Sequence, residues 1–484
     1  MTYTREPHYT ENVQDHLQQV QNLLEHPEVE TSAEPQPKDI SADGQESPLS
    51  LIPKQNLGAL REKLADLHPA DIAYILESLP IDVRLAVWEL VKADSDGDIL
   101  IEVSDAVRES LISSMSGEEL LEAAEQLDTD ELADLAPDLP NDVMHEVFMS
   151  LSVEEREQLR SAMSYPEDAV GALMDFDMVT IREDVTLEVV SRYLRRFDEL
   201  PGHTDQLFIV DRNDQFKGVL PLNLLLVNEP ETEVASLMLG DTITLHPSDK
   251  ADMAAQAFER YDLVSAPIVD KDGRLMGRIT VNTVMDFIRA ESESDVLNLA
   301  GLREEEDIFA SVWKSAKNRW MWLALNLCTA FFASRVIGSF EGTIEKFVAL
   351  ATLMPIVAGI AGNSANQTTT IIIRSLALGQ ITPTNARRLM SKELALGALN
   401  GLLWGSVAGL FAYMLYQNVM IGIIMTSAML LNLLLGAFAG LLIPLTMQRM
   451  GRDPAIGSSV LLTAITDSGG FFIFLGLATL LLIP

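Results

Sequence analysis

The chain has 484 residues, more than a single hydrophobic core organises, so several domains are expected. Its formal net charge of −37 is unevenly distributed: after Ser311 there are 11 Lys and Arg and 5 Asp and Glu, a net +6, so residues 1–311 carry −43. Such acidity repels nucleic acid and anionic lipid, and it attracts cations. The single cysteine, Cys328, excludes disulfides within the chain and cysteine-based metal sites.

Residues 1–50 are rich in Glu, Gln, Pro and Ser, a composition that predicts a disordered tail. They have no apolar stretch typical of a signal peptide, so no secretion signal is predicted. Over 51–165, apolar residues recur every three or four positions, as they do in packed helices. The stretch Asp71–Val83 is echoed by Glu131–Val143 at a constant offset of 60. We therefore expect an α-helical N domain built as a small superhelical stack.

Two similar units of alternating strands and helices follow, over 170–230 and 235–292. In each, an apolar strand ends at an Asp, a turn follows, and Gly218 or Gly277 opens the next strand. The two units resemble tandem CBS domains, which are α+β modules that bind regulatory ligands. CBS domains that hold a ribose often carry G-x-x-T-x-x-D, but Thr283 replaces the Asp of the second unit and Pro221 replaces the Thr of the first. The sequence therefore does not predict nucleotide binding.

Five apolar segments after Arg319 each reach the roughly 20 residues that cross a bilayer. They predict a five-helix α transmembrane domain over 316–484, with spans near 320–340, 347–373, 393–416, 419–446 and 457–483. Basic residues gather at one set of ends, which predicts that those ends are cytoplasmic. The nine inside positions are Lys314, Lys317, Arg319, Arg374, Arg387, Arg388, Lys392, Arg449 and Arg452, against Arg335 and Lys346 outside. We expect a multi-pass protein of the cell (inner or plasma) membrane, with a cytoplasmic N-terminus and Pro484 outside.

Two of these segments carry polar groups that a simple anchor would not need. In the fifth, Asp467 is the acid expected deep in an apolar segment, where a carboxylate is costly and usually faces a cavity. Oxygen ligands without Cys or His suit a hard divalent cation such as Mg²⁺, Mn²⁺ or Ca²⁺. One carboxylate per chain favours a homodimer around a shared pore. The candidate pore residues are Gly362, Asn363, Asn366, Thr463 and Asp467.

Three motifs resemble the MgtE family of magnesium channels. They are PIVAGIAGNSANQ from Pro355 to Gln367, KELALGALNG from Lys392 to Gly401, and RDPAIGSSVLLTAITD from Arg452 to Asp467. The order of parts also matches from about Leu51 to the end of the chain. The resemblance implies a homodimer with an axial pore, in which Asp467 holds the ion and Asn366 and the Thr463 backbone support it.

The same resemblance implies regulation by Mg²⁺ itself. Family members close when Mg²⁺ ions bound among cytoplasmic acids draw the soluble domains together, which is reasonable because bridging cations bias a two-state arrangement. The connecting "plug" helix is expected over 286–312. The candidate regulatory acids are Asp286, Glu291, Asp295 and, at the cytoplasmic mouth, Asp453. Asn282 departs from the family, since an acid is expected there.

Two rival interpretations remain. A CBS-regulated anion channel would need basic or helix-terminus anion sites at mid-membrane, which Asp467 argues against. A membrane-anchored sensor or enzyme would have featureless spans and a catalytic constellation, but the soluble part has no phosphate loop, nucleophile motif or HExxH. We therefore expect no enzyme. The partners expected are membrane lipid, divalent cations and a second copy, with no nucleic acid. The sequence leaves open Mg²⁺ against Mn²⁺ or Co²⁺, and a channel against a coupled carrier.

Overall fold

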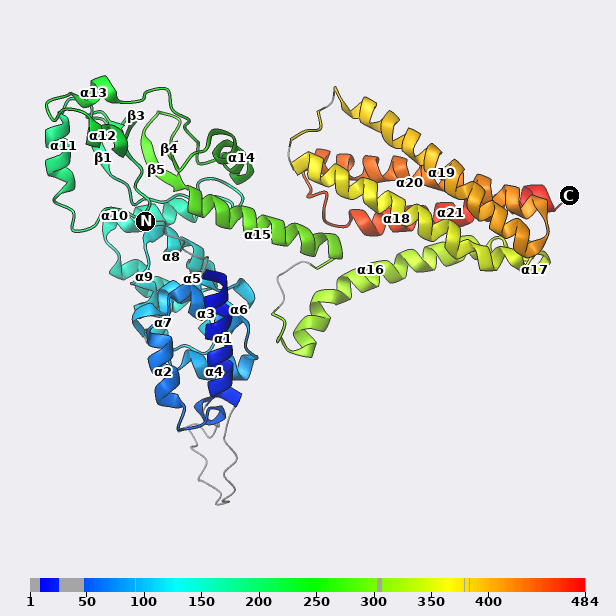
Figure 1. Ribbon diagram of the computed structural model, residues 1–484, viewed down its shortest axis with the longest axis horizontal. Helices are drawn as coiled ribbons and strands as arrows, with labels where there is room; N and C mark the ends of the chain where they lie inside the picture. The colour runs from blue at the N-terminus through cyan, green and yellow to red at the C-terminus, as the bar shows by residue number, and fades with distance from the viewer. Residues whose placement is uncertain are drawn as a thin grey trace, which may run out of the picture. The chain divides into compact units, whose positions relative to one another are not determined.

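The computed structural model describes residues 9–25, 48–91, 93–302, 307–377, 379–382 and 384–483. Contacts divide the chain into two compact units (Figure 1). Unit one comprises residues 1–291 and 305–310, and unit two comprises residues 292–304 and 311–484. The predicted position of Pro484 lies outside the described residues.

Unit one begins with a helical domain that has a single apolar core, as predicted. Its short helices follow one another closely along the chain, as expected of a helical stack. Several begin with a capping box, such as Ser116 with Glu119 and Ser152 with Glu155. The sequence echo corresponds to α3–α4 and α8–α9. The helices are α2 Leu57–Ala65, α3 Pro69–Glu77, α4 Ile81–Trp88, α5 Asp96–Glu102, α6 Asp105–Ile112, α7 Gly117–Ala124, α8 Thr129–Leu135, α9 Asn141–Ser150 and α10 Val153–Ala162, with 3-10 turns at Pro48–Leu51, Ala93–Ser95 and Ala136–Asp138.

The predicted disorder of residues 1–50 is wrong for Tyr9–Glu25, which form helix α1. Val20 is fully buried in the core of the helical domain, and Leu17, Leu23 and Leu24 pack against that core. The side chain of Asn56 donates a hydrogen bond to the carbonyl of Leu23 (2.7 Å). The polar composition of the tail obscured this three- and four-residue apolar spacing, which is a helix signal. The rest of the predicted tail before Pro48 lies outside the described residues.

A buried ion pair joins the helical domain to the segment that precedes the long helices. The guanidinium of Arg84 is fully buried and donates from Nη1 to Asp307 Oδ2 (2.6 Å) and from Nη2 to Asp307 Oδ1 (3.1 Å). Arg84 also donates to the carbonyls of Leu76 and Leu79, which end the preceding helix. A two-pronged, charge-assisted contact of this kind fixes both position and orientation.

The two predicted CBS units are both present, each with its own core. The first has β1 Thr180–Arg182, α11 Leu187–Leu194, β2 Gln206–Val210, β3 Phe216–Pro221 and α12 Leu222–Val227, with β1 parallel to β2 and β2 antiparallel to β3. The short helix α13 Val234–Leu237 also packs in the core of the first unit, through Val234. The second unit has α14 Ala251–Tyr261 and the antiparallel pair β4 Ser265–Val269 and β5 Leu275–Thr280. The predicted bounds are therefore wrong at their ends, because Val170 and Met174, expected in the first unit, lie in the core of the second. The turns of the two units meet, because Phe216 N donates to the carbonyl of Gly273 (2.9 Å).

The connecting helix differs from the predicted range 286–312. Helix α15 runs from Val281 to Ala300, directly after β5. It stops at Gly301, whose φ of 83° is readily adopted only without a side chain. The amide of Leu302 donates to the carbonyl of Leu297 and that of Gly301 to the carbonyl of Asn298, the hydrogen-bond pattern of a Schellman cap.

Unit two is a bundle of long helices (Figure 1). They are α16 Val312–Gly338, α18 Ala349–Ala377, α19 Ala386–Tyr416, α20 Val419–Arg449 and α21 Ser458–Leu482, with the short α17 Glu341–Lys346 after α16. The five predicted apolar segments are therefore five helices. Of the described helices, α16, α19, α20 and α21 are long and apolar enough to cross a membrane. Helix α18 is equally long but carries amides and hydroxyls, and its crossing stays a prediction.

Small residues allow these helices to approach closely. The buried glycines of α19 recur every fourth residue, from Gly397 to Gly409, and face the backbone of α20: a Cβ at Gly405 would lie 2.9 Å from the carbonyl of Thr426. On the other side of α20, a Cβ at Gly440 would lie 2.9 Å from the carbonyl of Ala365 in α18. Helix α20 thus packs on α18, α19 and α21, while α16 packs on α21.

We predict that Val20→Ala destabilises the docking of α1 by roughly 2 kcal/mol, because two buried methyl groups are lost and a cavity is left. Amide hydrogen exchange of residues 13–24 in the full chain measures this. Gln18→Ala, at an exposed position of the same helix, is the matched control. Equal exchange in the two variants would contradict the docking of α1.

We predict that Asp307→Asn costs about 3 kcal/mol of local stability, because it leaves the buried Arg84 guanidinium without its counter-charge. Faster amide exchange at Phe309, whose N–H donates to Asp307 Oδ1, measures the loss. Glu188→Gln, which breaks the exposed pair with Arg192, is the control and is expected to change exchange very little. Unchanged exchange at Phe309 would show that the pair does not hold this segment.

Candidate functional site

The candidate pore residues come from α18 and α21, which cross each other at a close contact. Gly362 of α18 faces Thr466 of α21, whose hydroxyl would lie 3.6 Å from a Cβ at the glycine. The contacts with α20 show that the two helices run antiparallel. Along α20 from Asn432 to Gly440, α18 runs from Val357 to Ala365. Along α20 from Asn432 to Gly436, α21 runs backwards from Gly470 to Thr466. Asn366 therefore lies one turn from Gly362 toward the level of Thr463.

Asp467 follows Thr466 directly and is half-buried. Within the described part of the chain, its carboxylate makes no hydrogen bond and no ion pair. Thr463 is exposed, and its hydroxyl donates within its own helix to the carbonyl of Ser459 (2.8 Å). The Thr463 carbonyl accepts a hydrogen bond from Thr466 Oγ1 (3.2 Å), which polarises it. It therefore lies close to the contact between Thr466 and Gly362.

The amides of α18 form a polar face. Asn363 and Gln367 are exposed and Asn366 is half-buried. At about 100° per residue these three positions lie within one third of the helix circumference. The structure thus brings Gly362, Asn366, Thr463 and Asp467 to one crossing, with Asn363 at the edge of the polar face.

The sequence indicated Asp467 as the one acid deep within the apolar segments, but the structure shows a second buried acid in the long helices. Glu393 of α19 is 5 % exposed and accepts a hydrogen bond from Thr368 Oγ1 of α18 (3.1 Å). Sequence reasoning missed it because Glu393 stands at the first residue of the predicted span 393–416, whereas α19 begins at Ala386. The preceding basic cluster, Arg387, Arg388 and Lys392, made Glu393 look like part of a charged helix end.

The predicted regulatory acids lie on α15 and before α21. Asp286 and Glu291 are exposed and Asp295 is half-buried on α15. Within unit two, Asp453 accepts from the side chain of Asn298, near the end of α15 (3.5 Å), and from the amide of Ala455 (2.8 Å). The end of the connecting helix is therefore in contact with the acid predicted at the pore mouth.

Within unit one, acids of the helical domain face acids of the CBS units. Burial, and then the charge of Asp175, raise the pKa of Asp130 to about 7. Partial desolvation raises the pKa of Asp134 to about 6, against the lowering effect of Arg108, and Asp105 and Asp286 add to the rise. Burial and then Asp128 raise the pKa of Asp177. These boundary acids therefore repel one another when ionised.

No group of three or more His, Cys, Asp or Glu that could hold a metal ion occurs among the residues that the structure describes. The predicted regulatory acids are thus not preassembled into one site. In the second CBS unit, the hydroxyls of Thr280 and Thr283 lie 3.0 Å apart, and Asn282 bonds to His203 Nε2 (2.8 Å). A carboxylate is absent at residue 283, so these residues do not fit the usual ribose-binding pattern.

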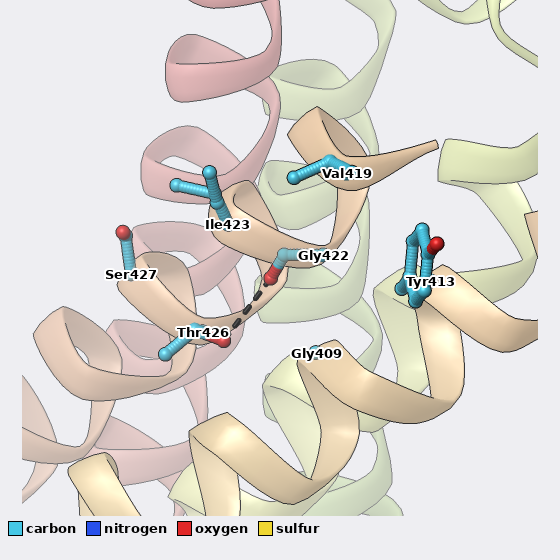
Figure 2. Close-up of a pocket in the computed structure, with 7 residues that line it drawn as sticks. All are labelled: Gly409, Tyr413, Val419, Gly422, Ile423, Thr426 and Ser427. Carbon is cyan, nitrogen blue, oxygen red and sulfur yellow. Dashed lines mark hydrogen bonds between the residues drawn. The ribbon is translucent and has the colours of Figure 1, made fainter. Parts of the chain in front are cut away.

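A pocket of about 340 Å³ lies between α19 and α20 (Figure 2). Its lining residues are Gly409, Tyr413, Val419, Gly422, Ile423, Thr426 and Ser427. The hydroxyl of Thr426 bonds to the carbonyl of Gly422 (3.0 Å), as the dashed line marks. The lining holds no charged side chain and none of the candidate pore residues, so this pocket is distinct from the α18–α21 crossing.

Comparison with protein families gives three matches in chain order. A model described as MgtE intracellular N domain matches residues 67–168, a CBS domain model matches 234–290, and a model described as divalent cation transporter matches 354–477. Together these ranges cover more than half of the chain. They correspond to the helical domain, the second CBS unit and most of the bundle, including the α18–α21 crossing.

Curated relatives span nearly the whole chain. The magnesium transporter MgtE of Thermus thermophilus is 29% identical over 432 residues, covering 88% of this chain and 95% of its own. That of Bacillus subtilis is 26% identical over 419 residues, covering 87% and 93%. A crystal structure of the cytosolic domain of the Mg²⁺ channel MgtE in complex with ATP is 29% identical, with a TM-score of 0.44, and covers 48% of this chain and 94% of that one. Because the intracellular N domain, CBS and transporter models all match it, the chain belongs to the MgtE family of divalent cation transporters.

Proposed function

We propose that this protein conducts Mg²⁺ across a membrane along the α18–α21 crossing, with Asp467 as the carboxylate ligand. The observation that carries the proposal is the Asp467 side chain, half-buried in an apolar bundle and without a partner among the described residues. An ionised group in such a place is stable only with water or a cation beside it. The names of the curated relatives, all magnesium transporters, support Mg²⁺ as that cation.

The chemistry of the crossing suits a hydrated ion. Mg²⁺ releases its water reluctantly and is usually held by one or two carboxylates, with several waters retained. The Asp467 carboxylate supplies charge, while the Asn366 amide and the Thr463 carbonyl can accept hydrogen bonds from bound water. Gly362 keeps side-chain volume out of the crossing.

The path is completed by a second copy of the chain. Asn363, Gln367 and Thr463 are exposed in the single chain, and polar groups facing hydrocarbon are unfavourable. Two polar faces around a twofold axis would enclose water and place two Asp467 carboxylates at one level. A homodimer is therefore the assembly that covers this surface.

We place the protein in the cell membrane with both soluble domains in the cytoplasm. The C-terminal ends of α18 and α20 and the N-terminal end of α19 carry Arg374, Arg449, Arg387 and Arg388, whereas Arg335 and Lys346 lie at the opposite ends of the helices. Basic residues favour the cytoplasmic side. The apolar surfaces of α16 and α19, which are exposed in the single chain, suit contact with lipid.

Cytoplasmic Mg²⁺ closes the path in this proposal. The boundary acids of unit one repel one another, and a divalent cation between them would relieve that repulsion. Asp286, Glu291 and Asp295 lie on the helix whose end contacts Asp453. The Arg84–Asp307 ion pair also attaches the helical domain to the segment before α16. Cation binding in unit one can thus bias the arrangement at the pore mouth.

Two alternatives are separated by experiment. A transporter of Mn²⁺ or Co²⁺ would use the same oxygen ligands, so each ion is assayed alone and in competition. A membrane-anchored sensor would need no polar crossing, and the amide face of α18 argues against it.

We predict that Asp467→Ala lowers Mg²⁺ entry into liposomes containing the full chain by about tenfold or more, because the ion loses its charged ligand. Asp467→Glu, which keeps the carboxylate, is expected to retain part of the flux. Wild-type flux in Asp467→Ala would exclude Asp467 as the pore ligand. Flux of Mn²⁺ or Co²⁺ without Mg²⁺ would favour the alternative cargo.

In the same liposomes, raising Mg²⁺ on the cytoplasmic face is expected to stop entry in the wild type. Asp286→Asn should shift closure to higher Mg²⁺, since one repelling acid is removed from the boundary. Glu259→Gln, an exposed acid on α14, is the control. Entry that ignores cytoplasmic Mg²⁺ would remove the regulatory part of the proposal.

We predict that unit one becomes more stable as the pH falls from 8 toward 5.5. A carboxyl whose folded pKa is raised to about 7 binds its proton more tightly in the folded state, so its contribution is greatest below the unfolded pKa and is lost as the pH rises through 7. Asp130→Asn, which is neutral at every pH, should raise the melting temperature at pH 8 and flatten this dependence. Thermal unfolding of the full chain, with Glu259→Gln as control, measures it. A steeper pH dependence in Asp130→Asn would contradict the assignment.

A further inference from the structure

We infer that Glu393 is a positioning residue of the ion path: through Thr368 it sets the rotation of α18 and so the direction of the Asn363 and Asn366 amides. The inference rests on the proposed function and goes beyond it, because it assigns a role to a buried acid outside the α18–α21 crossing.

The contact joins two helices of unit two. Glu393 Oε2 accepts from Thr368 Oγ1 at 3.1 Å, and both side chains are buried. The other carboxylate oxygen lies 3.6 Å from the ammonium of Lys392, whose side chain is largely exposed. A hydrogen bond to a charged acceptor is stronger than one between neutral groups, and it is directional.

Three consecutive threonines of α18 make three different contacts. Thr368 donates to Glu393 of α19, whereas Thr369 donates to the carbonyl of Gly440 in α20 (3.1 Å). Thr370 is exposed and donates within its own helix to the carbonyl of Asn366 (3.0 Å). Two side chains therefore bond α18 to two neighbouring helices, whereas the third bonds within α18 itself.

The threonine anchors lie opposite the amide face. Successive residues are about 100° apart around the helix axis. Around that axis, Thr368 lies roughly 140° from Asn363 in one direction, and Thr369 lies roughly 120° from Asn363 in the opposite direction. Both anchors are buried, while Asn363, Gln367 and Thr370 are exposed. A rotation of α18 that broke the Thr368 bond would therefore turn the amides away from their present direction.

Stability alone does not account for a carboxylate at this place. Burying an ionised group in a bundle is unfavourable, and apolar residues of similar size often pack at least as well. Apolar packing, however, tolerates rotation and sliding more readily than a directional bond does. The bond to Thr368 specifies one rotational setting of a helix whose other side carries the proposed ligands.

The test compares transport rates of full-length variants in liposomes. Thr368→Val keeps shape but removes the donor, and it is expected to lower the maximal Mg²⁺ rate about tenfold to a hundredfold, since misplaced groups are costly. Thr368→Ser should restore most of the rate, and Thr446→Val, at an exposed threonine of α20 that donates to the Leu442 carbonyl of its own helix, should leave it unchanged. Glu393→Gln, which can still accept the bond, should transport far better than Glu393→Leu. The double variant Glu393→Leu/Thr368→Val should be no worse than its more impaired single variant.

A second measurement reports the rotation itself. In a Cys328→Ala background, Gln367→Cys should react more slowly with a water-soluble thiol reagent when Thr368→Val is added, and at its normal rate when Thr446→Val is added. The inference is overturned if Thr368→Val transports and reacts like its background, if Thr446→Val is equally damaging, or if Glu393→Gln is as impaired as Glu393→Leu. Normal transport in Asp467→Ala would instead overturn the proposed function, whichever result Thr368→Val gives.

Discussion

The close backbone approach of α20 to its neighbours is the constraint on which unit two depends. Glycines of α19 face the α20 backbone on one side, and Gly436 and Gly440 admit Ala361 and Ala365 of α18 on another. With backbones so near, short polar side chains can bond across helices, as Thr426 does to the Gly405 carbonyl and Asn432 to the Val357 carbonyl. A larger residue at these positions would separate the helices and leave such groups unpaired.

The Asp467 carboxylate differs from the threonine hydroxyls around it. Thr368 and Thr369 donate to neighbouring helices and Thr466 donates within its own helix, whereas the Asp467 carboxylate and the buried hydroxyl of Ser468 have no hydrogen-bond partner in the described chain. In an apolar setting, that contrast points to a group kept available for water and ions. The ion path of the proposal thus borders threonine contacts between helices, which can hold its geometry while ions pass.

Unit one works by a different balance of forces. Burial raises the pKa of Asp130 and of Asp177, and acids across the boundary between the helical domain and the CBS units add to the rise, so the ionised carboxylates repel one another there. Arg278 pairs with the boundary acid Asp175 (2.7 Å) and so offsets part of its charge, whereas Arg84 pairs with Asp307 in the segment before α16. A domain boundary with opposing charges of this kind is sensitive to cations and protons, which is the property that a sensor of either requires.

The sequence by itself determined the order of domains and the five long helices, and it made Asp467 a candidate ligand, because hydrophobic periodicity, span length and an acid in an apolar run are local signals. It misjudged residues 9–25, where the polar composition hid an amphipathic helix, and the connecting helix, which Gly301 ends early. Only the tertiary structure decided that Glu393 meets Thr368 and that Arg84 meets Asp307, 223 positions apart. Such pairings depend on how helices rotate and pack against one another, and no local pattern along the chain encodes that rotation.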